Sequence, residues 1–122
     1  MKKDVVISIF EVLSHSLCVT SSDGQRIYDR LVSAMQAEQS IVLSFDKVTI
    51  LTTTFLDAAI GQLYGVFNEE QIRFLLKVKN IQAHDLVLLK RVIETAKQYF
   101  KNRHKGSDTV KKREKVKNED KN

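Results

Sequence analysis

The chain has 122 residues, of which 43% are hydrophobic and 29% charged, and this composition fits one small globular domain and excludes two. Its formal net charge of +5 suggests nucleic-acid binding at first sight. The excess charge, however, lies at one end. Residues 101–122 carry nine Lys/Arg and four Asp/Glu, whereas residues 1–100 carry eleven of each. The body of the chain is therefore neutral, which disfavours a basic groove there.

Cysteine usage and hydropathy exclude further classes. The single cysteine, Cys18, excludes an intramolecular disulfide and a cysteine zinc cluster, and we interpret it as a buried free thiol in a reducing compartment. No run approaches the roughly 18 apolar residues of a membrane span. The start at 1–4 lacks the apolar stretch and cleavage site of a signal peptide. We therefore expect a cytoplasmic protein without membrane contact.

The first half of the chain predicts strands and a helix. The β-branched run 5–10 is typical of a strand, and 17–20 of its short partner. The cluster 21–24 marks a helix start, capped by Ser or Asp, and the apolar spacing then predicts an amphipathic helix over about 24–38. The run 41–45 is apolar at four of five positions, as expected for a strand covered on both faces.

A buried helix is predicted after a short extended segment at 48–51. It covers 55–67 and is apolar nearly all round. Gly61 and Gly65 lie inside it, and each costs a helix roughly 1 kcal/mol relative to alanine. The simplest compensation is a close approach of this helix to a neighbouring segment.

The last third predicts one strand and one long helix. Residues 72–78 alternate in part, as in a strand, and Asp85 caps an amphipathic helix that ends near Lys101. Residues 102–122 have almost nothing to bury, which is typical of disorder. We therefore expect an α/β domain over 1–101 and a basic, disordered tail over 102–122. The order β-β-α-β-α-β-α favours a mixed or largely parallel sheet with helices on at least one face.

The sequence has no pattern typical of catalysis or metal binding. Glycine-rich phosphate loops and a nucleophile elbow are missing. The histidines are too scattered to converge on a metal: His15, His84 and His104. Several carboxylates lie at element ends, where capping explains them: Asp46, Asp57, Glu69 and Glu70. We expect no cofactor, no metal and no enzymatic activity. A small hydrolase or transferase is the weaker alternative, which a deep pocket with converging polar groups would favour.

One hydroxyl-rich turn stands out. Thr52-Thr53-Thr54 follows a buried strand and opens the predicted buried helix. Hydroxyls at a helix N-terminus lie where backbone N–H groups and the macrodipole favour an anion. A phosphate there would add about −1.5 to −2 charges. Plain capping and the β-propensity of threonine explain the same residues without a function, and physics alone favours that reading.

Several stretches resemble the STAS-like family of small bacterial domains (the DUF4325 type). They are Gly24 ahead of the first helix, the stretch 43–48, and the threonine turn followed by Phe55 and Asp57. In 43–48, a serine replaces the aspartate that usually precedes phenylalanine, while Asn80 and the long last helix also fit. The resemblance covers about residues 20–101. It implies a STAS-like mixed sheet of four to five strands with about three helices packed against it.

The resemblance also implies a function. The family is related more remotely to STAS domains that act as anti-sigma factor antagonists, in which a Ser/Thr at a helix start is phosphorylated by a histidine-kinase-like ATPase. The alignment of motifs places Thr53 and Thr54 at the two hydroxyl positions, Thr52 at an aspartate and Phe55 at a glycine. It implies a regulatory module that binds such an ATPase, or an anti-sigma-type protein, through Thr52, Thr53, Thr54, Phe55 and Asp57. Thr53 or Thr54 would be the phosphorylation switch.

Two further questions stay open at this point. The tail segment Lys111-Lys112-Arg113 would suit contacts with nucleic-acid phosphates, and a solubilising tail explains the same charge. An open sheet edge in a small domain is compatible with a monomer and with a homodimer.

Overall fold

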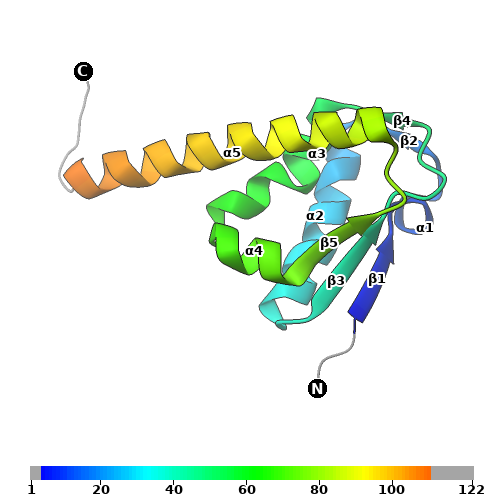
Figure 1. The fold of residues 1–122 in the computed structure, drawn as a ribbon, viewed down its shortest axis with the longest axis horizontal. Helices are drawn as coiled ribbons and strands as arrows, with labels where there is room; N and C mark the ends of the chain where they lie inside the picture. Colours follow the sequence, from blue (N-terminus) through cyan, green and yellow to red (C-terminus); the bar gives the residue numbers. More distant parts are fainter. Residues whose placement is uncertain (1–3, 111–122) are drawn as a thin grey trace.

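The computed structural model describes residues 4–110 of the chain, with side chains described for residues 4–102 (Figure 1). The elements follow in this order: β1 (Asp4–Ser8), α1 (Ile9–Leu13), β2 (Leu17–Cys18), α2 (Ser21–Gln36), β3 (Ser40–Ser44), β4 (Ile50–Leu51), α3 (Thr53–Ala59), the 3₁₀ helix η1 (Gly61–Gly65), α4 (Glu69–Leu75), β5 (Leu76–Lys79) and α5 (Ala83–Val110). None of the helices in this described part combines the length and apolar character that a membrane crossing requires.

The strands form two separate sheets, and every pairing in them is parallel. One sheet has the order β1-β3-β5, and the other consists of β2 and β4. The predicted α/β class is therefore confirmed. The expected single mixed sheet of four to five strands with about three helices is wrong, because the strands divide into three and two, and five α-helices and one 3₁₀ helix occur within residues 4–110.

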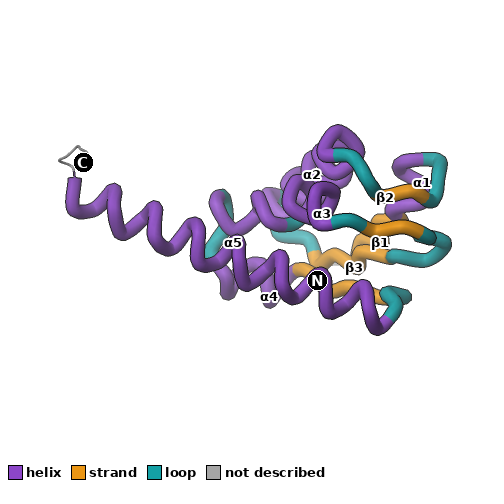
Figure 2. Tube along the Cα trace, turned by 90° about the horizontal axis from the view of Figure 1, so that it is seen from above, coloured by secondary structure: helices purple, strands orange, loops and turns teal. Residues whose placement is uncertain are grey.

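Helices cover one face of the three-stranded sheet. Ile7, Ile41 and Leu43 point into the core, where α2 and α3 lie side by side (Figures 1 and 2). On the other face, Val6 is 57% exposed and Lys77, two strands away in the same row, is exposed. The expectation that β3 is covered on both faces is confirmed only in part, because Ser40 and Val42 are half-buried, whereas Ile41, Leu43 and Ser44 are buried.

The first strand ends earlier than predicted because Ser8 caps a short helix. The Ser8 hydroxyl oxygen accepts the Glu11 backbone N–H at 3.1 Å, so Ile9 and Phe10 begin α1 instead of extending β1. The expected pairing of 17–20 with the first strand is wrong as well, since β2 pairs with β4. Helix α2 confirms the amphipathic helix, but Thr20 is its cap and Gly24 lies in its first turn.

The segment predicted as a strand over 72–78 is a helix in its first half. Asn68 and Gln71 form a reciprocal capping box, with the Gln71 N–H donating to Asn68 Oδ1 at 2.8 Å and the Asn68 N–H donating to Gln71 Oε1 at 3.0 Å. This cap starts α4 at Glu69, and the helix continues to Leu75. The strand β5 therefore begins only at Leu76 and ends at Lys79.

The predicted helix over 55–67 is interrupted at Ile60, where α3 ends and η1 begins. The expected close approach holds at Gly65, where an added Cβ would lie 2.5 Å from the Phe100 ring of α5. At Gly61 the nearest atom, Val92 Cγ1, would be at an ordinary 3.7 Å. Of the two glycines, only Gly65 therefore makes the expected close approach to a neighbouring segment.

The last helix is longer than predicted. Helix α5 continues past Lys101 to Val110, so its C-terminal part extends beyond the rest of the molecule (Figure 2). The remaining part of the predicted tail, 111–122, lies outside the described residues, and so does the basic cluster at 111–113.

Cys18 is a buried free thiol, as predicted. Burial is the main reason why its pKa is raised to about 12, with the carboxylates of Asp23 and Asp85 adding to the effect. At pH 8 a thiol with this pKa of about 12 is ionised in roughly one molecule in ten thousand. We expect Ellman's reagent to label the native protein at least roughly 100-fold more slowly than the guanidinium-unfolded protein. Equal rates in the two states would contradict the burial of this thiol.

Candidate functional site

The first threonine of the turn holds two elements together. Thr52 caps α3, since its hydroxyl oxygen accepts the Phe55 N–H at 3.2 Å. The same hydroxyl donates towards the end of β2, at 3.0 Å from the Val19 carbonyl oxygen and 3.3 Å from that of Cys18. The Thr52 N–H also donates to the Cys18 carbonyl at 3.1 Å. The role of Thr52 in the structure is therefore to join the start of α3 to β2.

The other predicted site residues divide between the surface and the core. Thr53 and Thr54 are the first two residues of α3 and are exposed, and Asp57, one turn later, is exposed too. Phe55 is only 1% exposed and belongs to the hydrophobic core. The assignment of Phe55 as a residue that contacts a partner is thus corrected, because a buried ring has no surface to offer.

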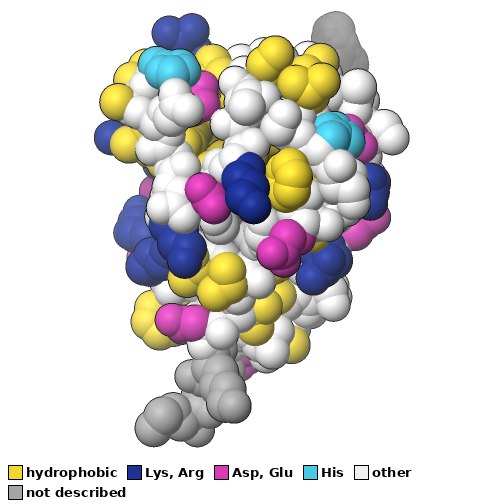
Figure 3. Space-filling model, turned by 90° about the vertical axis from the view of Figure 1, so that its right-hand side faces the viewer, with side chains coloured by type: hydrophobic (Ala, Val, Ile, Leu, Met, Phe, Trp, Pro, Cys, Tyr) yellow, Lys and Arg dark blue, Asp and Glu magenta, His cyan; other side chains and the backbone are white. Residues whose placement is uncertain are grey.

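An exposed apolar patch adjoins the turn. Leu17 and Ile50 are register partners in the β2–β4 sheet and are 46% and 50% exposed, and Val19, two residues after Leu17, is 40% exposed. Cys18 between them is buried, as expected from the alternation of side chains along an extended chain. Figure 3 looks onto the side that carries α1, β2 and β4, where hydrophobic side chains reach the surface among charged ones. We call Leu17, Val19 and Ile50 the β2–β4 patch.

A histidine and two charged residues anchor the loop before β2. The Leu17 N–H donates to His15 Nδ1 at 3.2 Å, so the opposite nitrogen, Nε2, carries the proton that is donated to Asp23 Oδ2 at 3.0 Å. Arg26 lies 3.7 Å from the other Asp23 oxygen and donates to the Val12 carbonyl at 2.8 Å. Both ring nitrogens of His15 are thus engaged, and this cluster positions Leu17.

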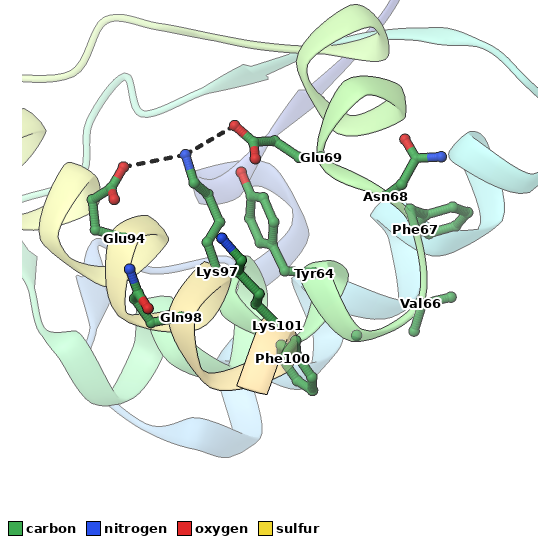
Figure 4. Close-up of a pocket in the computed structure, with 11 residues that line it drawn as sticks. Tyr64, Val66, Phe67, Asn68, Glu69, Glu94, Lys97, Gln98, Phe100 and Lys101 are labelled. Carbon is green, nitrogen blue, oxygen red and sulfur yellow. Dashed lines mark hydrogen bonds and ion pairs between the residues drawn. The ribbon is translucent and has the colours of Figure 1, made fainter. Parts of the chain in front are cut away.

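A second surface feature is a groove along α5, which faces α4 and β5 at one end and η1 with residues 66–68 at the other. It consists of two hollows of about 540 and 480 Å³, which share Tyr64, Glu69 and Lys97. Figure 4 shows the smaller hollow, in which Tyr64 lies beside the Lys97 and Glu69 side chains. Sequence reasoning did not predict this groove, because its α5 residues have the ordinary helical spacing of a core-facing stripe.

Ion pairs lie where the two hollows meet. Lys97 Nζ donates to Glu69 Oε2 at 2.9 Å and lies 3.2 Å from Glu94 Oε2, while Arg73 donates to the same Glu69 oxygen at 2.7 Å. The hydrogen bond between Lys97 and Glu69 lowers the pKa of the carboxyl group and raises the pKa of the amine. Burial raises the pKa of the Tyr64 phenol. The four charged side chains, Glu69, Arg73, Glu94 and Lys97, therefore satisfy one another.

No group of three or more His, Cys, Asp or Glu side chains within the described residues is arranged to hold a metal ion.

Residues 23–86, just over half of the chain, match the family model described as a STAS-like domain of unknown function (DUF4325). The matched segment starts in the first turn of α2 and ends in the first turn of α5, so it includes the threonine turn. It leaves out β1, α1 and β2, and with them Leu17 and Val19 of the β2–β4 patch. No curated protein and no solved structure gives a significant match.

Proposed function

The chain belongs to the family of STAS-like domains of unknown function, and from this membership we propose that it is a non-enzymatic regulatory module that binds a protein partner through the β2–β4 patch and the start of α3. The observation that supports this is the adjacency of three exposed apolar side chains to the exposed Thr53 and Thr54. Thr52 connects the two parts by bonding the start of α3 to the end of β2. Exposed apolar side chains beside polar groups are typical of interaction surfaces.

In this proposal the partner is a histidine-kinase-like ATPase and the switch is phosphorylation of Thr53 or Thr54. Phosphate on the first turn of α3 is compatible with the fold, because helix N-termini tolerate negative charge. Thr52 bonds the start of α3 to Val19 of the patch, so the same charge would weaken an apolar contact between the patch and a partner. Phosphorylation would thus release the partner without unfolding the domain.

Binding to a histidine-kinase-like ATPase encoded next to this chain tests the surface. We expect Ile50→Glu to weaken binding at least tenfold in calorimetry, because a carboxylate would replace the most exposed apolar side chain of the patch. Phe74→Glu is the matched control, since Phe74 is 78% exposed and lies on α4, away from the patch. Absence of a complex, or equal weakening by both variants, would contradict the proposal.

The switch is tested separately by incubation with that ATPase and ATP, followed by mass spectrometry. We expect the wild-type chain to gain phosphate and the double variant Thr53→Ala/Thr54→Ala to gain none. Thr95→Ala is the control, because Thr95 is an exposed threonine on α5. Phosphate that persists in the double variant would place the modification elsewhere.

A further inference from the structure

The groove is long and follows one face of α5. The α5 residues that line its two hollows recur every three or four positions, from Leu86 through Leu89, Ile93 and Lys97 to Phe100. At a rise of 1.5 Å per residue, this stretch extends over about 21 Å, the length of roughly four helical turns. The groove therefore has the dimensions of a short helix lying beside α5.

The floor of the larger hollow is apolar. It combines side chains from the residue before η1 and from α4, β5 and α5: Ile60, Ile72, Leu76, Val78, Leu86, Leu89 and Ile93. Several of them are fully buried below the surface, while Leu76, Val78, Leu86 and Ile93 are only partly covered. The partly covered side chains supply the apolar surface that an occupant would bury.

The rim of the larger hollow is cationic. It carries Arg73, Lys77, Lys90 and Lys97 against one carboxylate, Glu69. Arg73 and Lys97 both bind that carboxylate. Lys77 Nζ donates to the main-chain carbonyl of Arg73 at 2.9 Å, and neither Lys77 nor Lys90 has a carboxylate partner among the described residues. Lys90 and Lys77 are thus two positive charges beside the apolar floor that no carboxylate of the described residues pairs with, and Lys77 is held only by main-chain carbonyls at the end of α4, those of Arg73 and, at 3.4 Å, Phe74.

We propose that this groove binds an amphipathic helix of a partner protein, whose apolar side chains cover the floor and whose flanking Asp or Glu residues pair with Lys77 and Lys90. A helix that binds in an apolar groove places its anchoring side chains at every third or fourth position. The α5 residues that line this groove recur at the same spacing. The groove lies along α5 against α4, β5, η1 and residues 66–68, and none of its lining residues belongs to the β2–β4 patch, so the domain would have two docking surfaces.

The positive charge of the chain's own C-terminal segment excludes it as the occupant of this groove. Residues 111–122 contain six Lys/Arg, three Asp/Glu and a single apolar residue, Val116. A segment of this composition would be repelled by the rim and would have almost nothing to place on the floor. The Glu69–Lys97 ion pair is no barrier to a foreign helix, because exposed pairs contribute little and a partner carboxylate can replace Glu69.

The test uses the full chain and two synthetic peptides of about four helical turns with the same leucine stripe, one flanked by Glu and one by Lys. We expect fluorescence anisotropy to show at least tenfold tighter binding of the Glu peptide. The double variant Lys77→Glu/Lys90→Glu should weaken its binding at least tenfold. The matched control is Lys79→Glu/Arg91→Glu, which changes the net charge equally at two exposed residues next to the rim that do not line the groove.

Equal weakening by the two double variants would show an effect of net charge and overturn the proposal. No preference for the Glu peptide would overturn it too, as would binding of oleate without binding of either peptide, which would indicate a lipid site. Amide shifts in an NMR titration should change around Leu76, Leu86 and Ile93. Changes confined to Leu17 and Ile50 would place the peptide on the other surface and contradict the groove.

Discussion

Replacing Phe55 with alanine should lower the free energy of unfolding by about 3–5 kcal/mol. The ring is 1% exposed and packs in the core from the first turn of α3, so its removal leaves a cavity between elements that cannot close fully. Domains of this size have only about 5–15 kcal/mol of stability in total, so the variant should be visibly destabilised in urea. Equilibrium unfolding followed by circular dichroism measures the change.

Thr54→Ala is the matched control, because Thr54 precedes Phe55 directly and is exposed. We expect its stability to stay within about 0.5 kcal/mol of the wild type. The pair also separates two roles for the phenylalanine. If Phe55→Ala left stability intact and removed only partner binding, the ring would be a contact residue after all, and its burial in the structure would be refuted.

Gly24→Ala should destabilise the domain by about 1–3 kcal/mol, although alanine is the better helix former. In a free helix the same change is stabilising by roughly 1 kcal/mol. Here an added Cβ would lie 2.5 Å from the Phe55 carbonyl oxygen and 2.8 Å from the Ala58 Cβ, so α2 and α3 would have to move apart. The steric term therefore exceeds the gain in helix propensity.

Gly61→Ala provides the comparison for this effect. An added Cβ at Gly61 would have its nearest neighbour at 3.7 Å, an ordinary contact distance. We expect this variant to unfold within about 0.5 kcal/mol of the wild type in the same urea titration. If Gly24→Ala proved as stable as Gly61→Ala, the close crossing of α2 and α3 would be wrong.

The sequence predicts the parts of the fold that have long and regular periodicity. Helix α2, strand β3 and the start of α5 lie where apolar spacing placed them. The run from Ile72 to Val78 predicts a strand by its partial alternation, but a short apolar run fits the helical period as well. The signal that resolves it is the capping box of Asn68 and Gln71, which fixes a helix start just before the run.

The candidate site is predictable only in part, for a related reason. The threonine turn was found at a helix start because hydroxyl residues between a strand and a helix are a local pattern. The β2–β4 patch is not predictable from the sequence, because strands of two residues show no alternation. Its pairing also joins Leu17 to Ile50, which are 33 positions apart. The burial of Phe55 agrees with the buried helix predicted over 55–67, whereas its assignment as a partner contact came from the motif resemblance alone.

The parallel pairing of all the described strands has a consequence for how the chain folds. Val5 pairs with Ile41, Leu17 with Ile50 and Ile41 with Leu76, so each partner arrives more than 30 residues later. During synthesis, two helices and a strand (α1, β2 and α2) are made after β1 before its hydrogen-bonded neighbour β3 follows. Chains with such non-local pairings fold more slowly than helical bundles of similar size. The apolar N-terminal segment is therefore unpaired during this interval. In that state it is most prone to aggregation and most accessible to chaperones.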